Sequence, residues 1–354
     1  MRHREIEMIG TADRSGMREI TSRFLLAALG AILVITWATG CSGDGTPTEQ
    51  ITGPDPVDEV QIPAEPFTGT ASTITEAEIL QLVTDIAHDS TLGRSSPSPE
   101  LDEVAEYIAA VFAAAGLTPA GDDGGYLQWF QARSPGDPLA PNVVGWIEGS
   151  DPELRNEFVV LTAHFDHLGG VDDGPGQDQI FNGADDNASG TAALLEVAEA
   201  VGAMQIAPKR SVVVLAASAE ELGLRGSLHF LSHSPFPPAA MVANVNFDMI
   251  GRGETNHVYL IRGTGSENAA IALAVADQHQ DLGLTPQDSP DDYFIRRSDS
   301  GAFVLQGIDA LFFHSGLHDE YHEVSDEVAL LNTLKIEKVA KLGYWVAVEL
   351  AGRP

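Results

Sequence analysis

Cysteine is nearly absent from this sequence, and its scarcity excludes several kinds of site. The 354-residue chain contains one cysteine, Cys41. A single cysteine cannot form a disulfide within the chain or build a zinc site from thiolates. The chain also lacks a Gly-x-Ser-x-Gly elbow and a Gly-x-Gly-x-x-Gly motif. Serine hydrolases of that type and dinucleotide-binding enzymes are therefore not indicated.

Basic residues are also scarce. Lys and Arg number 19 against 52 Asp and Glu, which gives a formal net charge of −33 at pH 7. Phosphate backbones and anionic membrane surfaces repel such a chain, so we expect no nucleic-acid partner. We interpret the charge as a solvated acidic surface.

The longest apolar run spans residues 24–37 and follows Arg18 and Arg23. A basic segment, a short apolar segment and small residues before a cleavage point are typical of a secretory signal peptide. The run is short for a membrane span. The small residues end at Gly40-Cys41, which resembles a bacterial lipobox, where the cysteine carries the lipid. An ordinary signal peptide, or an uncleaved anchor with an incidental cysteine, is the alternative.

The lipobox interpretation divides the chain into three parts. Residues 1–40 are then a lipoprotein-type signal peptide, residues 41–67 a flexible tether rich in Gly, Thr, Pro and acidic groups, and residues 68–354 a single catalytic domain. This division predicts an extracytoplasmic protein that is anchored to the bacterial cell envelope by a lipid on Cys41, with the membrane as its partner there.

Apolar strands alternate with helical segments from residue 157 onward. The predicted strands are 126–131, 142–147, 158–163, 211–217, 241–247, 257–262 and 310–313, and the predicted helices are 75–86, 100–115, 188–202, 224–231, 267–282 and 331–350. Continuous apolar strands between helices are typical of parallel sheets that are covered on both faces. We therefore predict an α/β fold with a central mixed, mostly parallel sheet and helices on both faces. Ligands bind beyond the carboxyl ends of the strands in such sheets.

Five acidic or imidazole side chains stand at or just beyond the ends of apolar runs. They are His164, Asp185, Glu221, Asp248 and His322. Each residue alone has an ordinary explanation, such as a helix cap or a polar strand end. Together they form a nitrogen and oxygen donor set that suits a pair of divalent zinc ions. Two metal ions about 3.5–4 Å apart can activate a water and polarise a carbonyl.

The motifs around these residues are specific in their order. Along the chain they read His-x-Asp, Gly-x-Asp-Asp-x-x-Ser-Gly, Ala-Glu-Glu-x-Gly-x-x-Gly-Ser, Asn-Phe-Asp-Met-x-Gly and Tyr-His-x-x-x-Asp. This set resembles the secreted bacterial leucyl-type aminopeptidases of the co-catalytic zinc exopeptidase superfamily, over roughly residues 75–350. The resemblance implies a zinc-exopeptidase (phosphorylase/hydrolase-like) fold. It also implies a metallopeptidase that removes N-terminal residues from peptides with a zinc-bridging hydroxide.

The resemblance further implies a metal role for each matching residue. His164 and Asp248 would hold one zinc ion, Glu221 and His322 would hold the other, and Asp185 would bridge both. Two Zn²⁺ per chain are therefore expected.

Four other residues receive roles from the same resemblance. Glu220 would be the general base, and Tyr321 would donate a hydrogen bond to the oxyanion. Asp166 and Asp326 would orient His164 and His322. The peptide bond between the two aspartates at 185 and 186 is expected to be cis.

Three alternatives stay open at this point. A carboxypeptidase-type relative needs a basic pocket, for which Arg225, Arg252, Arg296 and Arg297 are candidates. A glutaminyl-cyclase-type enzyme uses the same scaffold with one zinc ion, but such relatives depart from the full ligand set. The third alternative is a lipoprotein that binds zinc or peptide without catalysis.

One position departs from the pattern of the relatives. Ser300 stands where many of them have histidine, which affects expectations for the substrate pocket and not for the metal site. Phe303, Phe312 and Phe313 are predicted to lie in the core. His318 is interpreted as a loop residue, because its surroundings match neither short zinc motif.

Overall fold

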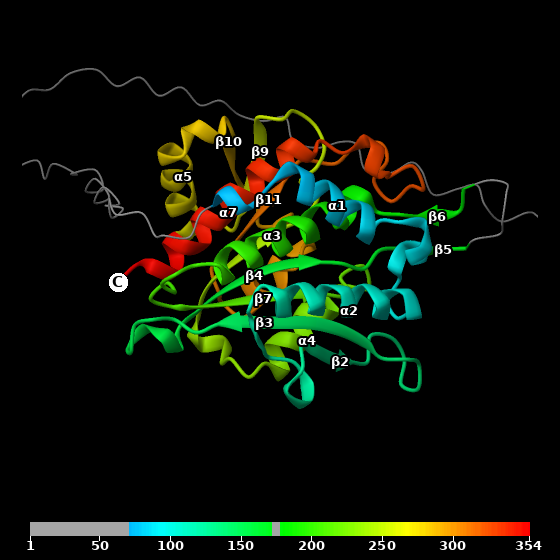
Figure 1. Ribbon diagram of the computed structural model, residues 1–354, viewed down its shortest axis with the longest axis horizontal. Helices are drawn as coiled ribbons and strands as arrows, with labels where there is room; N and C mark the ends of the chain where they lie inside the picture. Colours follow the sequence, from blue (N-terminus) through cyan, green and yellow to red (C-terminus); the bar gives the residue numbers. More distant parts are fainter. Residues whose placement is uncertain (1–70, 172–177) are drawn as a thin grey trace, which may run out of the picture. The chain divides into compact units, whose positions relative to one another are not determined.

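A nine-stranded mixed sheet forms the centre of the computed structural model, which describes residues 71–171 and 178–354 (Figure 1). The strand order is β1-β3-β7-β4-β8-β11-β9-β10, and β2 also pairs with β3. The predicted signal peptide, the lipobox cysteine Cys41 and the predicted tether lie outside the described residues.

The four central strands are parallel, and the flanking strands are mostly antiparallel. The parallel strands are β7 (Ser211–Ala217), β4 (Phe158–His164), β8 (Met241–Phe247) and β11 (Ala310–His314). The flanking strands are β1 (Thr118–Pro119), β2 (Leu127–Phe130), β3 (Ala140–Ile147), β9 (His257–Arg262) and β10 (Thr285–Pro290), and β10 pairs parallel with β9. A separate pair joins β5 (Gly169–Gly170) to β6 (Ile180–Phe181). The predicted mixed, mostly parallel α/β sheet is confirmed.

Helices cover both faces of this sheet. One face carries α1 (Glu76–Ile86), α2 (Pro99–Ala114), α3 (Gly190–Gly202), α5 (Asn268–Gln278) and α7 (Thr333–Gly352), and the other carries α4 (Arg225–His233) and α6 (Ser300–Leu305). Short 3₁₀ helices lie at Ala71–Thr73, Asp89–Arg94, Asp122–Gly124, Leu154–Asn156, Pro238–Ala240, Gln280–Leu282, Ile295–Arg297 and Val328–Leu330. The strands supply both apolar layers because their side chains alternate between faces. In β4, Val159 and Leu161 join the larger cluster, whereas Phe158 and Val160 join the smaller one.

Local signals explain where the predicted helices begin. The Thr75 hydroxyl caps α1 by accepting a hydrogen bond from the Glu78 N–H, and Ser98 caps α2 through the Leu101 N–H. Strand β10 was not predicted, because the sequence Thr-Pro-Gln-Asp-Ser-Pro contains two prolines and no apolar run. Its place at the edge of the sheet tolerates both prolines.

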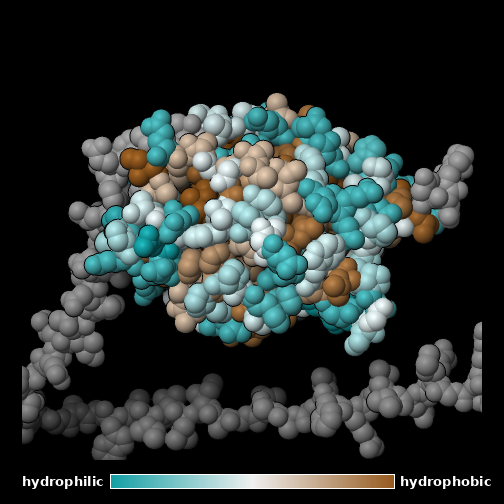
Figure 2. All heavy atoms as spheres, turned by 60° about the horizontal axis from the view of Figure 1, so that its bottom comes forward, coloured by the Kyte–Doolittle hydropathy of each residue, from teal (hydrophilic) through white to brown (hydrophobic). Residues whose placement is uncertain are grey.

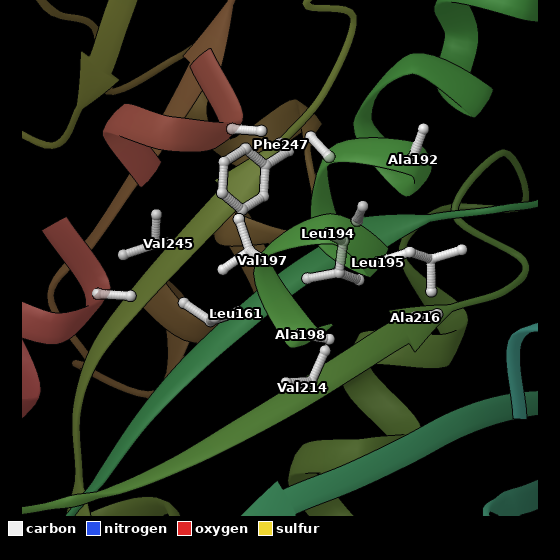
Figure 3. Packing of buried hydrophobic residues seen from close by; sticks show 14 of the residues in the cluster. Leu161, Ala192, Leu194, Leu195, Val197, Ala198, Val214, Ala216, Val245 and Phe247 are labelled. Atoms are coloured by element: carbon white, nitrogen blue, oxygen red, sulfur yellow. The ribbon is translucent and has the colours of Figure 1, made fainter. Parts of the chain in front are cut away.

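Helix α3 is almost entirely buried, because it lies between the sheet and its neighbours α1, α2 and α7. Figure 3 shows Leu194 and Val197 of α3 among Leu161, Val214 and Val245 from three parallel strands. Figure 2 shows a face on which hydrophilic and apolar residues are mixed. Within residues 71–171 and 178–354, no helix is both long enough and apolar enough to span a membrane.

Candidate metal centre

The parallel strands bring the candidate ligands to one edge of the sheet. His164 is the last residue of β4, and Asp248 directly follows β8. Glu220 and Glu221 come a few residues after β7, which pairs with β4. Carboxyl ends of neighbouring parallel strands meet at the same edge, so residues far apart in the sequence become neighbours.

Asp186 lies at the centre of this group. Its Oδ1 lies 3.4 Å from Nε2 of His164, and its Oδ2 lies 3.2 Å from Nε2 of His322. On the first side, Oδ1 of Asp248 lies 3.8 Å from the same His164 nitrogen. On the second side, Oε1 of Glu221 lies 3.4 Å from His322 Nε2. One carboxylate thus faces two separate donor sets, which is the arrangement expected of a ligand that bridges two metal ions.

The prediction that Asp185 holds this bridging position was wrong by one residue. The Asp185 carboxylate turns away, accepting a hydrogen bond from the Gly251 N–H at 2.6 Å and lying 3.3 Å from His318 Nε2. His318, interpreted above as a loop residue, therefore takes part in the surroundings of the site. The cis peptide bond is also displaced by one residue from the prediction and joins Asp186 to Asn187.

His167 is a member of the cluster that the sequence reasoning missed. Its Nδ1 lies 3.1 Å from Oε1 of Glu221 and 3.8 Å from Oδ2 of Asp186. Its ring packs against Gly183, where any added Cβ would come within 2.4 Å of the imidazole. The available signal was the sequence His-Phe-Asp-His, in which a second histidine follows His164 by three residues. His167, Asp186 and Glu221 offer three donor atoms close enough to hold one cation, as do His164, Asp186 and Asp248.

Asp326 has a different role from the predicted one. Both of its carboxylate oxygens accept the Asp185 N–H, at 3.1 and 3.0 Å, and Oδ2 also accepts the Asp186 N–H at 3.1 Å. Asp326 therefore fixes the backbone that carries Asp186. Among the described residues, Asp326 accepts no hydrogen bond from the His322 ring.

Asp166 is only partly as predicted. Its Oδ1 lies 3.7 Å from Nδ1 of His164, beyond hydrogen-bond distance, whereas its backbone carbonyl lies 3.2 Å from that nitrogen. The same Oδ1 accepts the Glu220 N–H at 3.1 Å. Asp166 thus supports both His164 and the loop that carries Glu220 and Glu221.

Arg94 is a buried residue that joins these segments, and no motif signalled it. Its side chain is fully buried and donates to the carbonyls of Phe165, at 2.6 Å, and Gly183, at 2.7 Å, as well as to that of Asn182. Burial lowers the pKa of Arg94 to about 10, although nearby carboxylates oppose that shift. The guanidinium therefore stays charged at neutral pH and ties the end of β4 to the segment before Asp186.

The charges in the cluster stabilise one another. Burial disfavours the charged form of His164, but Asp166, Asp186 and Asp248 outweigh it and raise its pKa well above the usual value. Burial acts against the charged form of Asp186 as well, but the two histidines beside it hold its pKa well below the usual range. The carboxylates of Asp186 and Glu221 raise the pKa of His322 to about 10. The carboxylates that stabilise the protonated histidines would also attract a metal cation to the same positions.

Glu220 and Tyr321 face the pocket beside the cluster. Burial raises the pKa of Glu220 well above the usual value, although the positive charge of His164 opposes the shift. Tyr321 stacks on His322 with a centroid separation of 3.8 Å. Both residues line a cavity of about 340 Å³ together with His164, Asp186 and residues from the segments after β8, β10 and β11.

The donor set fits zinc. It consists of imidazole nitrogens and carboxylate oxygens, the ligand types that zinc accepts apart from thiolates. His322 Nε2 is a buried atom without a hydrogen bond, although two carboxylate oxygens lie within 3.4 Å of it. A buried polar nitrogen without a hydrogen bond needs an explanation. A metal ion between this nitrogen and the two carboxylates would provide one.

The fold and this cluster define an α/β protein with an imidazole–carboxylate metal site at the carboxyl edge of its parallel strands. The profile of peptidase family M28 matches residues 142–345. The chain therefore belongs to peptidase family M28.

Individual relatives agree with this assignment. The chain is similar to aminopeptidase YwaD of Bacillus subtilis, with 27% identity over 207 residues that cover 52% of this chain and 39% of YwaD. It is 34% identical to the probable leucine aminopeptidase 2 of Aspergillus oryzae over 174 residues, covering 47% of this chain and 32% of that protein. The chain thus spans less than half of the length of these curated relatives. In structure it is similar to the LapA aminopeptidase of Legionella pneumophila, with a TM-score of 0.64 and 23% identity over 80% of this chain and 74% of LapA.

Proposed function

We propose that this protein is a zinc-dependent aminopeptidase that binds two zinc ions. The observation that carries the proposal is the position of Asp186 between two donor sets, with a carboxylate of raised pKa, Glu220, at the same cavity. Membership of family M28 and the similarity to proteins described as aminopeptidases support it.

The two donor sets divide the ligands between two subsites. We call the set with His164 and Asp248 the strand subsite, and the set with Glu221 and His322 the loop subsite; Asp186 belongs to both. When bound, zinc ions polarise a peptide carbonyl and lower the pKa of a water molecule.

Glu220 and Tyr321 act on the substrate from the sides of the cavity. Glu220 takes a proton from the attacking water and returns it to the amine that leaves, which requires a carboxylate pKa closer to neutrality than that of an exposed glutamate. Burial supplies a shift in that direction. A tyrosine hydroxyl keeps its proton at neutral pH, and burial with the surrounding carboxylates raises the pKa of Tyr321 further, so that it donates a hydrogen bond to the oxyanion.

The cavity offers little basic charge for the C-terminus of a peptide. Of the four carboxylates in the lining, Asp186, Glu221 and Asp248 belong to the zinc subsites, and Glu220 is left to attract an α-ammonium group and repel an α-carboxylate. Of the four arginines considered for a carboxypeptidase, only Arg297 lines the cavity. Arg252 is paired with Glu320 at 2.6 Å, and Arg225 and Arg296 are exposed.

The test is hydrolysis of aminoacyl-p-nitroanilides by the purified protein, with Glu220→Gln and Glu323→Gln in parallel. Glu220→Gln removes the proton acceptor and is expected to lower kcat by about 10²–10⁴-fold with zinc content unchanged. Glu323→Gln changes an exposed glutamate near the site and serves as the control. Chelation should abolish activity, and zinc should restore it.

Further substrates distinguish the aminopeptidase from the carboxypeptidase and glutaminyl-cyclase alternatives. N-terminally blocked peptides report carboxypeptidase activity, and N-terminal glutaminyl peptides report cyclisation. A zinc-loaded protein that is inert on every free aminoacyl substrate contradicts the proposal.

We also propose that the mature protein is attached to the bacterial cell envelope through lipid on Cys41. The apolar run before Gly40-Cys41 supports this proposal. Cys41→Ser should move the protein from the membrane fraction to the soluble fraction, and mass spectrometry of the mature N-terminus should find lipid on the wild type only. If Cys41 of the wild-type protein carries no lipid, the proposed membrane attachment is wrong.

A further inference from the structure

Strand β11 ends with a histidine in a position that the alternation of the strand assigns to an apolar side chain. Ala310 and Phe312 point to the sheet face covered by α4 and α6, whereas Leu311 and Phe313 point to the other face. His314 continues the first series and is 3% exposed. An imidazole at such a position needs a polar partner.

Only one of the two ring nitrogens has such a partner. Nδ1 lies 2.9 Å from the backbone carbonyl oxygen of Asp248. A carbonyl can only accept, so Nδ1 carries the hydrogen, and in the neutral ring Nε2 is then an acceptor. Nε2 is buried and has no hydrogen-bond partner among the described residues. Leaving such an acceptor unpaired is unfavourable, and a ligand that supplies a donor there gains stability.

The same histidine lines the cavity beside the metal centre. Phe294 and Phe312 flank its ring, with centroid separations of 5.1 and 5.6 Å, and both also line the cavity. Met249 and Leu317 add further apolar surface. The wall next to His314 is thus aromatic and aliphatic, whereas the rest of the lining includes Ser298 and the carboxylates of the metal centre.

We propose that His314 makes this cavity selective for an N-terminal aromatic residue that carries a hydrogen-bond donor, above all tyrosine, whose phenol donates to Nε2. The inference rests on the proposed aminopeptidase function and assigns the substrate class of the same site. Phenylalanine fills the same aromatic wall but leaves the acceptor unpaired. Leucine lacks both the ring and the donor.

Charge at the mouth of the cavity excludes a different donor. Lysine could reach an acceptor through an apolar stem, but Arg297 lines the cavity and its guanidinium stacks over Tyr293 at 5.8 Å. A second positive charge beside Arg297 is unfavourable. A neutral hydrogen-bond donor on an aromatic ring, such as a phenol, can pair with Nε2 of His314 and brings no second positive charge next to Arg297.

The test compares kcat/KM for tyrosyl-, phenylalanyl- and leucyl-p-nitroanilide. For the wild type we expect tyrosyl over phenylalanyl by about fivefold to tenfold, the worth of one neutral hydrogen bond. His314→Asn keeps a short amide whose N–H can donate to the Asp248 carbonyl, and it withdraws the acceptor from the ring position, because the asparagine Oδ1 lies closer to the backbone than Nε2 does. The ratio of tyrosyl to phenylalanyl kcat/KM should fall to about one in this variant, with zinc content unchanged. His233→Asn alters an exposed histidine at the end of α4 and is the matched control.

Three outcomes overturn the inference. The wild type shows no tyrosyl preference; His314→Asn keeps the preference; or it loses activity equally on all three substrates, which assigns His314 to holding Asp248 instead. His314→Phe, which fills the position without any nitrogen, repeats the test if His314→Asn does not fold.

A binding measurement separates this inference from the proposed function. Calorimetry on the zinc-loaded protein compares tyrosinamide with phenylalaninamide. If no nitroanilide is hydrolysed, the aminopeptidase proposal fails. Tighter binding of tyrosinamide, lost in His314→Asn, then still supports the role of His314, whereas equal or absent binding overturns it.

Discussion

The strand subsite and the loop subsite share Asp186 but are built differently. His164 and Asp248 lie at the ends of the neighbouring parallel strands β4 and β8, and the His164 side chain is 2% exposed. Glu221 and His322 come from loops, and the His322 side chain is 35% exposed. His322 also has a positive φ of 60°, which a non-glycine residue adopts only where its surroundings hold it. A sheet fixes one subsite, and loop contacts such as those of His167 fix the other.

This difference has a thermodynamic consequence. Ligands that are fixed before binding lose little conformational entropy when a metal arrives, whereas loop residues must be ordered. The strand subsite should therefore hold zinc more tightly than the loop subsite. The four predictions below test this contrast, beginning with the largest expected effect.

Removing the shared ligand should abolish the distinction between the subsites. Asp186→Asn is expected to weaken zinc binding at both subsites, because it removes the one carboxylate common to both donor sets. It should also lower kcat/KM by about 10³-fold or more. Zinc content by atomic absorption and kcat/KM are the measurements. Asp185→Asn is the matched control, and zinc loss in Asp185→Asn with normal content in Asp186→Asn would return the bridging role to Asp185.

Arg94 ties the end of β4 to the segment that carries the shared ligand Asp186, so its removal should loosen both subsites. Arg94→Met leaves buried carbonyls of Phe165 and Gly183 without their donor and should lower the free energy of unfolding by about 3 kcal/mol, measured by urea denaturation. Arg133→Met removes an exposed arginine that donates to the Ser96 carbonyl and should change it by about 0.5 kcal/mol or less. Equal effects of the two substitutions would contradict this role.

Metal removal should occur in two steps. Titration of the zinc-loaded protein with a chelator is expected to release the loop-subsite ion first, at about tenfold lower chelator concentration than the strand-subsite ion. Activity should fall with the first step. His322→Ala should remove the first step and retain the second. A single step in the wild type would show that the subsites do not differ.

The most local effect is expected at His167. His167→Gln removes the imidazole that contacts Glu221 and should weaken zinc binding at the loop subsite by about tenfold, with the strand subsite unchanged. Calorimetric zinc titration resolves the two subsites. His233→Gln tests for a general effect of losing a histidine, and an unchanged loop subsite in His167→Gln would make that histidine a packing residue only.

The residues that carried the strongest local pattern were predicted best. Strands β7, β8 and β9 begin and end where the predicted runs do, and β8 keeps its bounds although it contains the buried polar residues Asn244 and Asn246. Strand β10 has no such run, and its pairing with β9 depends on contacts at the sheet edge. The structure also extends β4 and β11 to His164 and His314, residues whose polarity had marked the ends of the predicted runs.

The choice between Asp185 and Asp186 could not be made from the sequence. Both are acidic, both are buried and they are adjacent, so no spacing or periodicity separates them. The peptide conformation, the N–H groups held by Asp326 and the partner of Asp185 at Gly251 decide which carboxylate faces the histidines.

The sequence by itself determined the α/β fold, the edge of the sheet that carries the site and the residue types gathered there, because strand burial and the order of the motifs are local properties. The tertiary structure alone decided which aspartate lies between the histidines, that His167 and His318 join the site, that Arg94 holds it together and that His314 keeps an unpaired acceptor in the cavity. Each of these depends on the direction of a side chain relative to segments far away in the chain, and such directions are set by packing and hydrogen bonds that no local pattern records.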